Sequence, residues 1–361
     1  MKEGWEYKKL GEVCDIYQPK TLSKKDFVDD GEYFVYGANG VIGKHDHYNH
    51  ECSEVLLGCR GSVGTVTISK PFSWINGNAM VIRPRTSNLL QTFLAYQLRN
   101  IDLSRVITGI AQPQITRQSL SPTSISIPSL AEQQHIVEEL DLLSSIKEKK
   151  NNQLNELDNL AQSLFYEMFG DPITNEKGWE VSKLGEICIF LQGEQVPIKE
   201  QSEIQHEGMV RFLRIIDFTQ GNEPPRFVFC KDKKHILDND EIAIVRYGSP
   251  GFVCYGKYGV IANNLFKIAP KVKDRFAFRY LIAWLSSEAF QSVVNGNQYG
   301  AALQAIKFGT IKDIPFIQPP LDLQQQFASN IEAIEHQKEL IKQSITEVET
   351  LFNSRMDYYF N

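Results

Sequence analysis

The chain is 361 residues long, with 42% hydrophobic and 11% aromatic side chains and a formal net charge of −6. This length and composition are typical of globular proteins and are sufficient for two ordinary domains, each with its own core. No apolar run approaches the length of a membrane span, and the segment that begins Met1-Lys2 lacks the apolar core of a signal peptide, so we expect a cytoplasmic protein with no membrane partner.

The first stretch of the chain returns later in the sequence. Residues 4–16 read GWEYKKLGEVCDI, and residues 178–190 read GWEVSKLGEICIF. Glycine, tryptophan, glutamate, lysine, leucine and cysteine recur at the same spacing, which indicates that the globular part of the chain is duplicated.

Each copy continues with short β-type runs separated by glycine and asparagine. These runs are residues 55–58, 65–68 and 79–82 in the first copy and 242–245, 252–255 and 265–268 in the second. Between the first two runs lies CRGSVG (59–64) in one copy and RYGSPG (246–251) in the other. We therefore expect Arg60 and Arg246 to occupy equivalent places, each leading into a glycine-rich turn, and Asn78 to correspond to Asn264.

A helical segment, a polar loop and a last strand complete each globule. The helical segments are residues 89–98 and 276–290, and the last strands end at Pro128 and Pro319. The offset between the copies grows from 174 to 191 residues, mostly through insertions between residues 190 and 240 of the second copy. Loops that diverge on a common frame are expected when two copies bind different things.

A long amphipathic helix follows each globule. From Ile136 to Met168, seam residues recur alternately four and three positions apart, which is typical of a coiled coil. Ser129 and Glu132 form a predicted capping box, and Gly170 with Pro172 marks the end. The same pattern returns 191 residues later without a gap. The predicted seam of the helix pair includes Leu140, Leu143, Lys147, Leu154, Leu157, Ile331, Ile334, Lys338, Ile345 and Val348.

Two lysines lie on this seam, Lys147 and its equivalent Lys338. A buried polar residue in a coiled coil can fix register and orientation at a cost in stability. A lysine that extends its charged end past the edge of the seam is the alternative. The pattern leaves both open.

The negative charge is concentrated in the helices. Residues 1–129 carry 14 basic and 12 acidic side chains, and residues 171–318 carry 18 and 17, whereas residues 130–170 carry 3 and 8 and residues 319–361 carry 3 and 7. A near-neutral globule can bind phosphate through a local patch, so the globules can face DNA. The acidic helices are expected to face protein.

The order globule, helix, globule, helix predicts a rigid spacer. Two helices of about 39 residues would each extend roughly 58 Å at 1.5 Å per residue. Antiparallel packing would place one globule at each end of the pair and relate the halves by an approximate twofold axis.

Signatures of catalysis are missing from the sequence. There is no phosphate-binding G-x-x-x-x-G-K-[ST] loop, no G-x-S-x-G elbow and no Asn-Pro-Pro-aromatic motif. We expect no metal site, because the spacing of His45, His47, His50 and Cys52 matches no standard zinc signature. Solvated turn acids are the favoured interpretation of Asp217, Asp238, Asp240 and Glu241, and the six cysteines are expected to be mostly buried thiols.

Taken together, these motifs resemble one family. The order GWE-x-x-x-LGE, R-x-G-S-x-G, Pro-x-L-x-x-QQ and a long helix ending SLFYEMFGDP, repeated once, is similar to the DNA specificity subunit of type I restriction-modification systems. The resemblance covers the chain from end to end. It implies an α+β fold with two β-rich α/β target recognition domains, at residues 1–129 and 171–318, joined by two long antiparallel coiled-coil helices, at 130–170 and 319–361, in a pseudo-twofold internal repeat.

The resemblance also implies a function and partners. Each recognition domain would read one half of an asymmetric double-stranded DNA site, and the helices would dock two modification (methyltransferase) subunits, which restriction subunits then join. The chain would be non-catalytic and would bind no cofactor, with S-adenosylmethionine on the modification subunits. The alternatives are a coiled-coil scaffold or adaptor that does not bind DNA, and a detached fragment of a single-chain methylase-nuclease, which predicts catalytic motifs that are absent.

The loops of the globules are the expected DNA contacts, because arginine suits bidentate contact with guanine or phosphate and glutamine can read adenine. The candidate DNA-binding residues are Lys44, His45, Arg60, Gln112, Gln114, Arg117, Arg246, Tyr247, Lys257, Gln298, Tyr299, Gln304 and Lys307.

Overall fold

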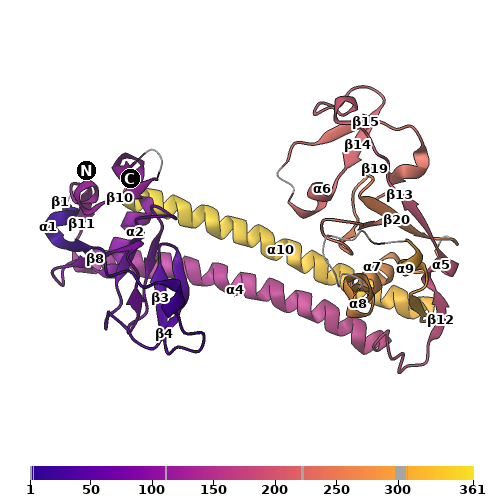
Figure 1. Ribbon diagram of the computed structural model, residues 1–361, viewed down its shortest axis with the longest axis horizontal. Helices are drawn as coiled ribbons and strands as arrows, with labels where there is room; N and C mark the ends of the chain where they lie inside the picture. Colours follow the sequence, from indigo (N-terminus) through magenta and orange to yellow (C-terminus); the bar gives the residue numbers. More distant parts are fainter. Residues whose placement is uncertain are drawn as a thin grey trace. The chain divides into compact units, whose positions relative to one another are not determined.

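The computed structural model describes residues 2, 4–109, 112–220, 223–272, 274–296, 306 and 308–361, which form two compact units (Figure 1). Unit 1 contains Met1–Asn152 and Lys342–Asn361, and unit 2 contains Gln153–Ile341. Each unit holds one copy of the repeated globule and parts of the two long helices, α4 (Leu130–Phe169) and α10 (Leu321–Phe360).

Unit 1 is built from small, mostly antiparallel sheets. The four-stranded sheet has the order β2-β8-β5-β6, a three-stranded sheet has the order β4-β3-β7 with β3 and β7 parallel, and β1 pairs with β11 and β9 with β10. The strands are β1 (Glu6–Lys9), β2 (Cys14–Tyr17), β3 (Tyr33–Gly37), β4 (Gly40–His45), β5 (Val55–Gly58), β6 (Val66–Ile68), β7 (Trp74–Ile75), β8 (Ala79–Pro84), β9 (Ile107–Thr108), β10 (Gln114–Ile115) and β11 (Ser124–Ile127). The short helices are α1 (Leu10–Val13), α2 (Gln91–Asn100) and α3 (Arg117–Leu120), with 3-10 turns η1 (Lys24–Asp26) and η2 (Leu103–Val106).

Unit 2 repeats this plan with an enlarged second sheet. Its sheets are β13-β20-β17-β18, β15-β14-β19-β16 with β14 and β19 parallel, and the pair β12-β21. The strands are β12 (Glu180–Lys183), β13 (Cys188–Gln192), β14 (Met209–Leu213), β15 (Arg226–Phe229), β16 (Ile236–Leu237), β17 (Ile242–Val245), β18 (Val253–Cys254), β19 (Gly259–Ile261), β20 (Leu265–Pro270) and β21 (Pro315–Gln318). The helices are α5 (Leu184–Ile187), α6 (Ile215–Thr219), α7 (Phe278–Ser286), α8 (Glu288–Gly296) and α9 (Phe308–Lys312), with η3 (Ile198–Glu200) and η4 (Lys233–His235).

The repeated Lys-Leu-Gly-Glu sequence makes the same short helix in each unit. The carboxylate of Glu12 accepts a hydrogen bond from the backbone N–H of Lys9 at 3.1 Å, and Glu186 does the same for Lys183. The glycine is needed because a Cβ at Gly11 would lie 2.8 Å from the side chain of Ser121. Close packing therefore explains why this motif is kept in both copies.

A buried glutamine connects each globule to its long helix. Gln133 has 0% exposure, and its amide accepts from the N–H of Leu90 at 2.8 Å while donating to the carbonyls of Asn88 and Pro128. In unit 2, Gln324 makes the corresponding contacts with Ala277 N–H and Pro319 O. The first glutamine of each QQ pair thus fixes the helix start against the preceding strand and the neighbouring helix or the residues that lead into it.

The long helices run antiparallel within each unit. In unit 1, Glu139 near the start of α4 pairs with Arg355 near the end of α10, with 2.6 Å between Oε1 and Nε. In unit 2, the rings of Phe165 near the end of α4 and Phe327 near the start of α10 are 5.9 Å apart. The expected fold class, two β-rich globules with an internal repeat and a long antiparallel helix pair, is confirmed.

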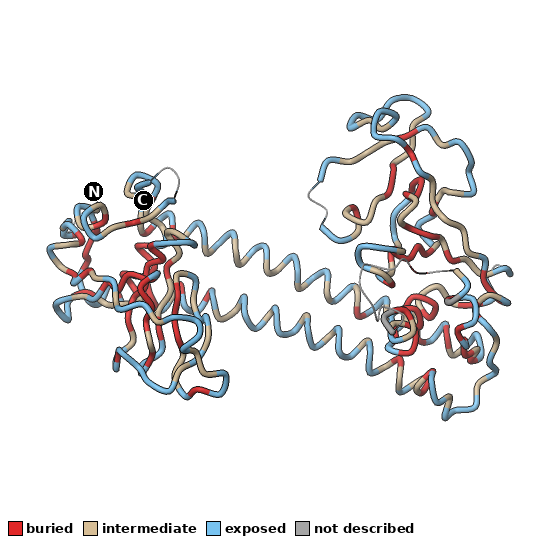
Figure 2. The backbone as a smooth tube through the Cα atoms, viewed as in Figure 1, coloured by how far each residue is buried: buried red, intermediate tan, exposed pale blue. Residues whose placement is uncertain are grey.

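Each core takes side chains from both helices. The core of unit 1 contains Ile136 and Leu140 from α4 and Met356 and Tyr359 from α10. The core of unit 2 contains Phe165 and Phe169 from α4 and Phe327 from α10, with Leu164, Met168 and Ile331 packed partly buried against it. Between these anchored ends the helices are mainly exposed or half-buried (Figure 2).

One expected helix is interrupted. The sequence predicts a single helical segment at 276–290, but α7 ends at Ser286 and α8 begins at Glu288. Ser287 between them is extended, and both its N–H and its hydroxyl donate to the carbonyl of Trp284. A serine that competes for backbone carbonyls in this way ends a helix that hydrophobic periodicity alone would continue.

The buried glutamines predict a specific loss of stability. Gln133→Ala should lower the free energy of unfolding by about 1–3 kcal/mol, because the buried carbonyl of Pro128 and the partly buried N–H of Leu90 and carbonyl of Asn88 lose their partner. The exposed neighbour provides the control, since Gln134→Ala removes only a surface contact to Glu138. Urea unfolding of both variants compares them, and equal losses would contradict the role given to Gln133.

Candidate nucleic-acid interface

A glycine turn follows β5 in unit 1 and β17 in unit 2. In unit 1, Gly58 donates its N–H to Thr65 O and Gly64 to Gly58 O, and in unit 2, Val245 and Gly251 repeat these bonds with Phe252 O and Val245 O. The glycines at the two turn positions have positive φ, 78° and 87° in unit 1 and 97° and 87° in unit 2, which a side chain rarely tolerates. The turn therefore presents its variable residues on a fixed backbone.

The expected equivalence of Arg60 and Arg246 is wrong by one residue. The N–H of Cys59 donates to Asn78 O, and the N–H of Arg246 donates to Asn264 O, so Arg246 corresponds to the buried Cys59. Arg60 corresponds to Tyr247, and both are exposed. The two arginines stand one position apart in the turn, because the backbone pairing follows the glycines and not the arginines. The expected match of Asn78 with Asn264 is confirmed by the same bonds.

In unit 1, the structure brings Arg60 and Gln114 together. Arg60 forms an isolated β-bridge with Gln114, and its Nε donates to Gln114 Oε1 at 3.4 Å. Gln112 is exposed nearby in sequence, and exposed Arg117 starts α3, which Thr116 caps. These four residues come from the turn and from the loop around β10.

Two further candidates lie on a different sheet of unit 1. Lys44 and His45 belong to β4, and Lys44 is exposed. The ring of His45 packs edge-on against Trp74 at 5.3 Å and against His47 at 5.6 Å. Aromatic packing is therefore the observed role of His45, and its assignment to DNA stays a prediction.

In unit 2, the candidates surround the corresponding turn. Arg246 is half-buried, and the hydroxyl of Tyr247 lies 3.5 Å from Asn263 Oδ1. The ammonium group of Lys257 donates a hydrogen bond to the carbonyl of Asp217. The remaining four, Gln298, Tyr299, Gln304 and Lys307, lie outside the described residues.

Three residues for which the sequence already disfavoured a metal role, His50, Glu241 and Asp217, are bound to other side chains. His50 is buried, with Nε2 2.9 Å from the hydroxyl of Tyr17 and Nδ1 2.6 Å from Asn49 Oδ1, and burial lowers its pKa. Glu241 pairs with Lys267 and Asp217 with two arginines. In the part of the chain that the structure describes, no group of three or more histidine, cysteine or acidic side chains is arranged to hold a metal.

The seam lysines make matching ion pairs. In unit 1, Lys147 Nζ lies 2.7 Å from Glu349 Oε1, and in unit 2, Lys338 Nζ lies 2.7 Å from Asp158 Oδ1. Lys338 and Glu349 stand 191 residues after Lys147 and Asp158, so one pair is the repeat of the other. Lys147 is exposed and Lys338 is half-buried, and each pairs across the seam, which agrees with the interpretation that the charged end extends past the edge of the seam.

Electrostatics differ between the two pairs. Both side chains of the Lys147 pair are almost half exposed, at 46% and 45%. Lys338 is only 17% exposed, and although burial lowers its pKa, hydrogen bonds to Asp158 and Glu335 outweigh this, so the net pKa is raised.

The ion pair of Glu139 with Arg355 in unit 1 is also reflected in a pKa. Hydrogen bonds from Arg355, and to a smaller extent from Tyr359, lower the pKa of Glu139.

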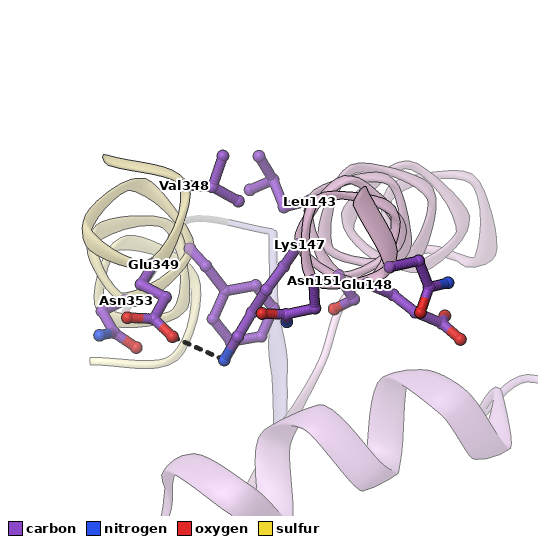
Figure 3. Close-up of a pocket in the computed structure, with 10 residues that line it drawn as sticks. Leu143, Lys147, Glu148, Asn151, Val348, Glu349 and Asn353 are labelled. Carbon is purple, nitrogen blue, oxygen red and sulfur yellow. Dashed lines mark ion pairs between the residues drawn. The ribbon is translucent and has the colours of Figure 1, made fainter. Parts of the chain in front are cut away.

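The other predicted seam residues vary in burial. Leu140, Leu143 and Ile334 are buried, and the half-buried ones are Leu154, Leu157, Ile331, Ile345 and Val348. In unit 1 the seam opens into a groove of about 710 Å³ beside Lys147, with Leu143 and Val348 on one side and polar residues such as Glu148, Asn151 and Asn353 around it (Figure 3).

The fold and these surfaces define a class of protein: a duplicated, two-globule chain joined by an antiparallel helix pair. The family model described as "Type I restriction modification DNA specificity domain" matches residues 2–156 and again residues 176–350. The chain therefore belongs to the family of type I restriction-modification specificity subunits.

One curated relative and two solved structures are similar to almost the whole chain. The type I restriction enzyme MjaIX specificity subunit of Methanocaldococcus jannaschii is 25% identical over 91% of this chain and 86% of its own length. The crystal structure of a type I restriction-modification S subunit from M. genitalium covers 98% of this chain and 95% of its own, at 14% identity and a TM-score of 0.61. A chain from a structural study of type I complex assembly and conformational transition covers 100% and 98%, at 18% identity and a TM-score of 0.63.

The ion pair in unit 1 predicts a charge-reversal cycle. Lys147→Glu and Glu349→Lys should each lower the free energy of unfolding by up to about 1 kcal/mol, because like charges then meet, and the double variant should recover most of the loss. Urea unfolding at low and high salt measures the effect, which salt should weaken. Reversing Lys8, which pairs with Glu6 on the same strand, is the control. A double variant as unstable as the summed single variants would refute the pairing.

Proposed function

We propose that this chain reads a bipartite, asymmetric double-stranded DNA site, with one half for each recognition domain. The observation that carries the proposal is the glycine turn, whose backbone is the same in both units while Arg60 in one is replaced by Tyr247 in the other. A fixed frame with different side chains suits two different base sequences, because sequence is read by side chains at base edges.

The helix pair acts as a spacer and docking element in this proposal. Its middle is exposed, it carries the negative excess of the chain, and in unit 1 it has an open groove beside Lys147. Two modification subunits would bind these helices and bring S-adenosylmethionine and the methyltransferase sites, while this chain does no chemistry and holds no cofactor. Restriction subunits would join that assembly.

The expected location is the cytoplasm, where such an assembly meets the genome. Among the described helices, none has the length and apolar character needed to cross a membrane.

Gel shifts with the chain, alone and with co-expressed modification subunits, test DNA binding. Binding that weakens steeply as salt rises is expected, because lysine and arginine contacts to phosphate release counterions. If neither preparation binds DNA in a salt-dependent way, the chain is an adaptor of another kind.

One arginine tests the first recognition domain. Arg60→Ala should reduce affinity for the cognate site roughly tenfold and relax discrimination within a single half-site, since a bidentate arginine contact would be lost. Arg85→Ala is the matched control, because Arg85 forms a surface ion pair with Asp15 away from the turn. Equal effects of both substitutions on binding would argue against a reading role for the turn.

The spacer role predicts a change in site geometry. Deleting residues 151–157 together with 342–348 removes one heptad from each helix, about 10 Å at 1.5 Å per residue. The preferred gap between half-sites should shorten by about three base pairs, or binding should be abolished, with half-site sequences unchanged. Selection from a library of duplexes with variable gaps measures this, and an unchanged gap would overturn the spacer role.

A further inference from the structure

A buried carboxylate with two arginines occurs in unit 2 where unit 1 has only a hairpin. In unit 1, β3 turns directly into β4 through the bulged hairpin at Gly37 and Gly40. In unit 2, the equivalent strand β14 leads instead into α6, which holds Asp217 at 3% exposure. The helix α6 with its buried aspartate is therefore specific to unit 2 and is not part of the structure that the two units share.

Asp217 is used entirely in holding its neighbours. Its Oδ1 accepts from Arg211 Nη2 at 2.5 Å, and its Oδ2 accepts from the backbone N–H of Arg214 at 2.9 Å and from Arg214 Nε at 3.0 Å. Burial raises the pKa of Asp217, but the hydrogen bonds from Arg214 and Arg211 outweigh it, and the net pKa is lowered. The carboxylate is ionised at neutral pH and orients both guanidinium groups.

The side chains of Arg211 and Arg214 are partly exposed to solvent, whereas the carboxylate of Asp217 is not. The side chains of Arg211 and Arg214 are 33% and 22% exposed, against 1% for the carboxylate of Asp217. The contacts to Asp217 and Pro224 O use Nε and Nη2 of Arg214, and the Nε of Arg211 is buried, which leaves Nη1 of Arg214 and the Nη groups of Arg211 for other acceptors. With Lys257 on the carbonyl of Asp217, three positive charges surround one buried negative charge.

This cluster adjoins the glycine turn of unit 2. A Cβ placed on Gly248 would lie 3.6 Å from Ile215 Cδ1, so α6 packs directly beside the turn that carries Arg246 and Tyr247. A cavity of about 520 Å³ continues from Gly251 past Phe218 and Phe252 to Lys257. The arginines thus extend the surface on which the candidate DNA contacts of this unit lie.

We infer that Asp217 is a positioning residue of the second recognition domain, which holds Arg211 and Arg214 so that their remaining N–H groups bind acceptors of DNA. This inference rests on the proposed function. The acceptors are the O6 or N7 atoms of guanine in the half-site or the oxygens of a backbone phosphate, since an arginine N–H donates to both kinds. A single arginine would neutralise Asp217, and the second adds net positive charge at the surface.

The experiment uses the full chain in complex with its modification subunits. Once methylation mapping has given the cognate site, competition binding compares duplexes with either half-site scrambled, for wild type, Asp217→Asn, Arg211→Ala and Arg214→Ala. If guanine is read, each variant should lose roughly tenfold or more in affinity only where the half-site of unit 2 is intact. If phosphate is bound, affinity should fall on all duplexes and each arginine variant should reduce the salt slope by about one.

A matched control separates positioning from folding. Glu54 is a buried carboxylate paired with Arg83 in unit 1, so Glu54→Gln should lower thermal stability without changing discrimination at the half-site of unit 2. Wild-type discrimination and salt slope in Asp217→Asn and both arginine variants would overturn the inference. So would a loss of affinity that Glu54→Gln reproduces without any change in salt slope. Failure of the wild type to prefer the cognate site would instead defeat the proposed function.

Discussion

The packing of helix ends into both cores is the constraint on which the rest of the structure depends. The core of unit 1 needs Met356 and Tyr359 from α10, and the core of unit 2 needs Phe165 and Phe169 from α4. Neither globule buries its apolar surface with its own stretch of sequence alone. The buried glutamines then fix where each helix starts, which makes each helix a rigid continuation of a globule rather than a tethered linker.

The two units share their backbone structure and differ at a few sites, which fits the proposal that they read different half-sites. The Lys-Leu-Gly-Glu helix, the buried glutamine at the start of each long helix and the glycine turn are nearly identical in the two units, and all three fix the backbone. The units differ at a turn residue that is arginine in one unit and tyrosine in the other, and in the inserted α6 of unit 2. In the proposed function, stability and recognition would depend on different residues of one fold.

The sequence was sufficient for the features that depend on periodicity and repetition. The two long helices, the repeat and the glycine turns follow from spacing, because a seam or a positive-φ glycine is a local requirement. The exact correspondence of the two turns could not be predicted from the side chains. Two arginines in similar motifs suggest a pair, but the backbone hydrogen bonds pair Arg246 with Cys59 and not with Arg60.

Contacts that depend on side-chain orientation, or on residues far apart in the sequence, could not be predicted. The break at Ser287 depends on its hydroxyl and N–H turning back to Trp284, which hydrophobic periodicity does not encode. Asp217 looked like a solvated turn acid, since nothing local reveals that Arg211 and Arg214 fold over it. The acids opposite the seam lysines could be found only once the register of the antiparallel helices was known.

The dependence of unit 1 on Met356 and Tyr359 has a consequence for biosynthesis. A growing chain is released from its amino end first, and most domains can fold as soon as their own residues emerge. Here the first globule must wait, with part of its apolar surface uncovered, until the final turns of α10 leave the ribosome. The first globule is therefore made early but completed only when α10 has emerged, and it stays open to aggregation or to chaperones while the residues from 153 to the end of α10 are synthesised.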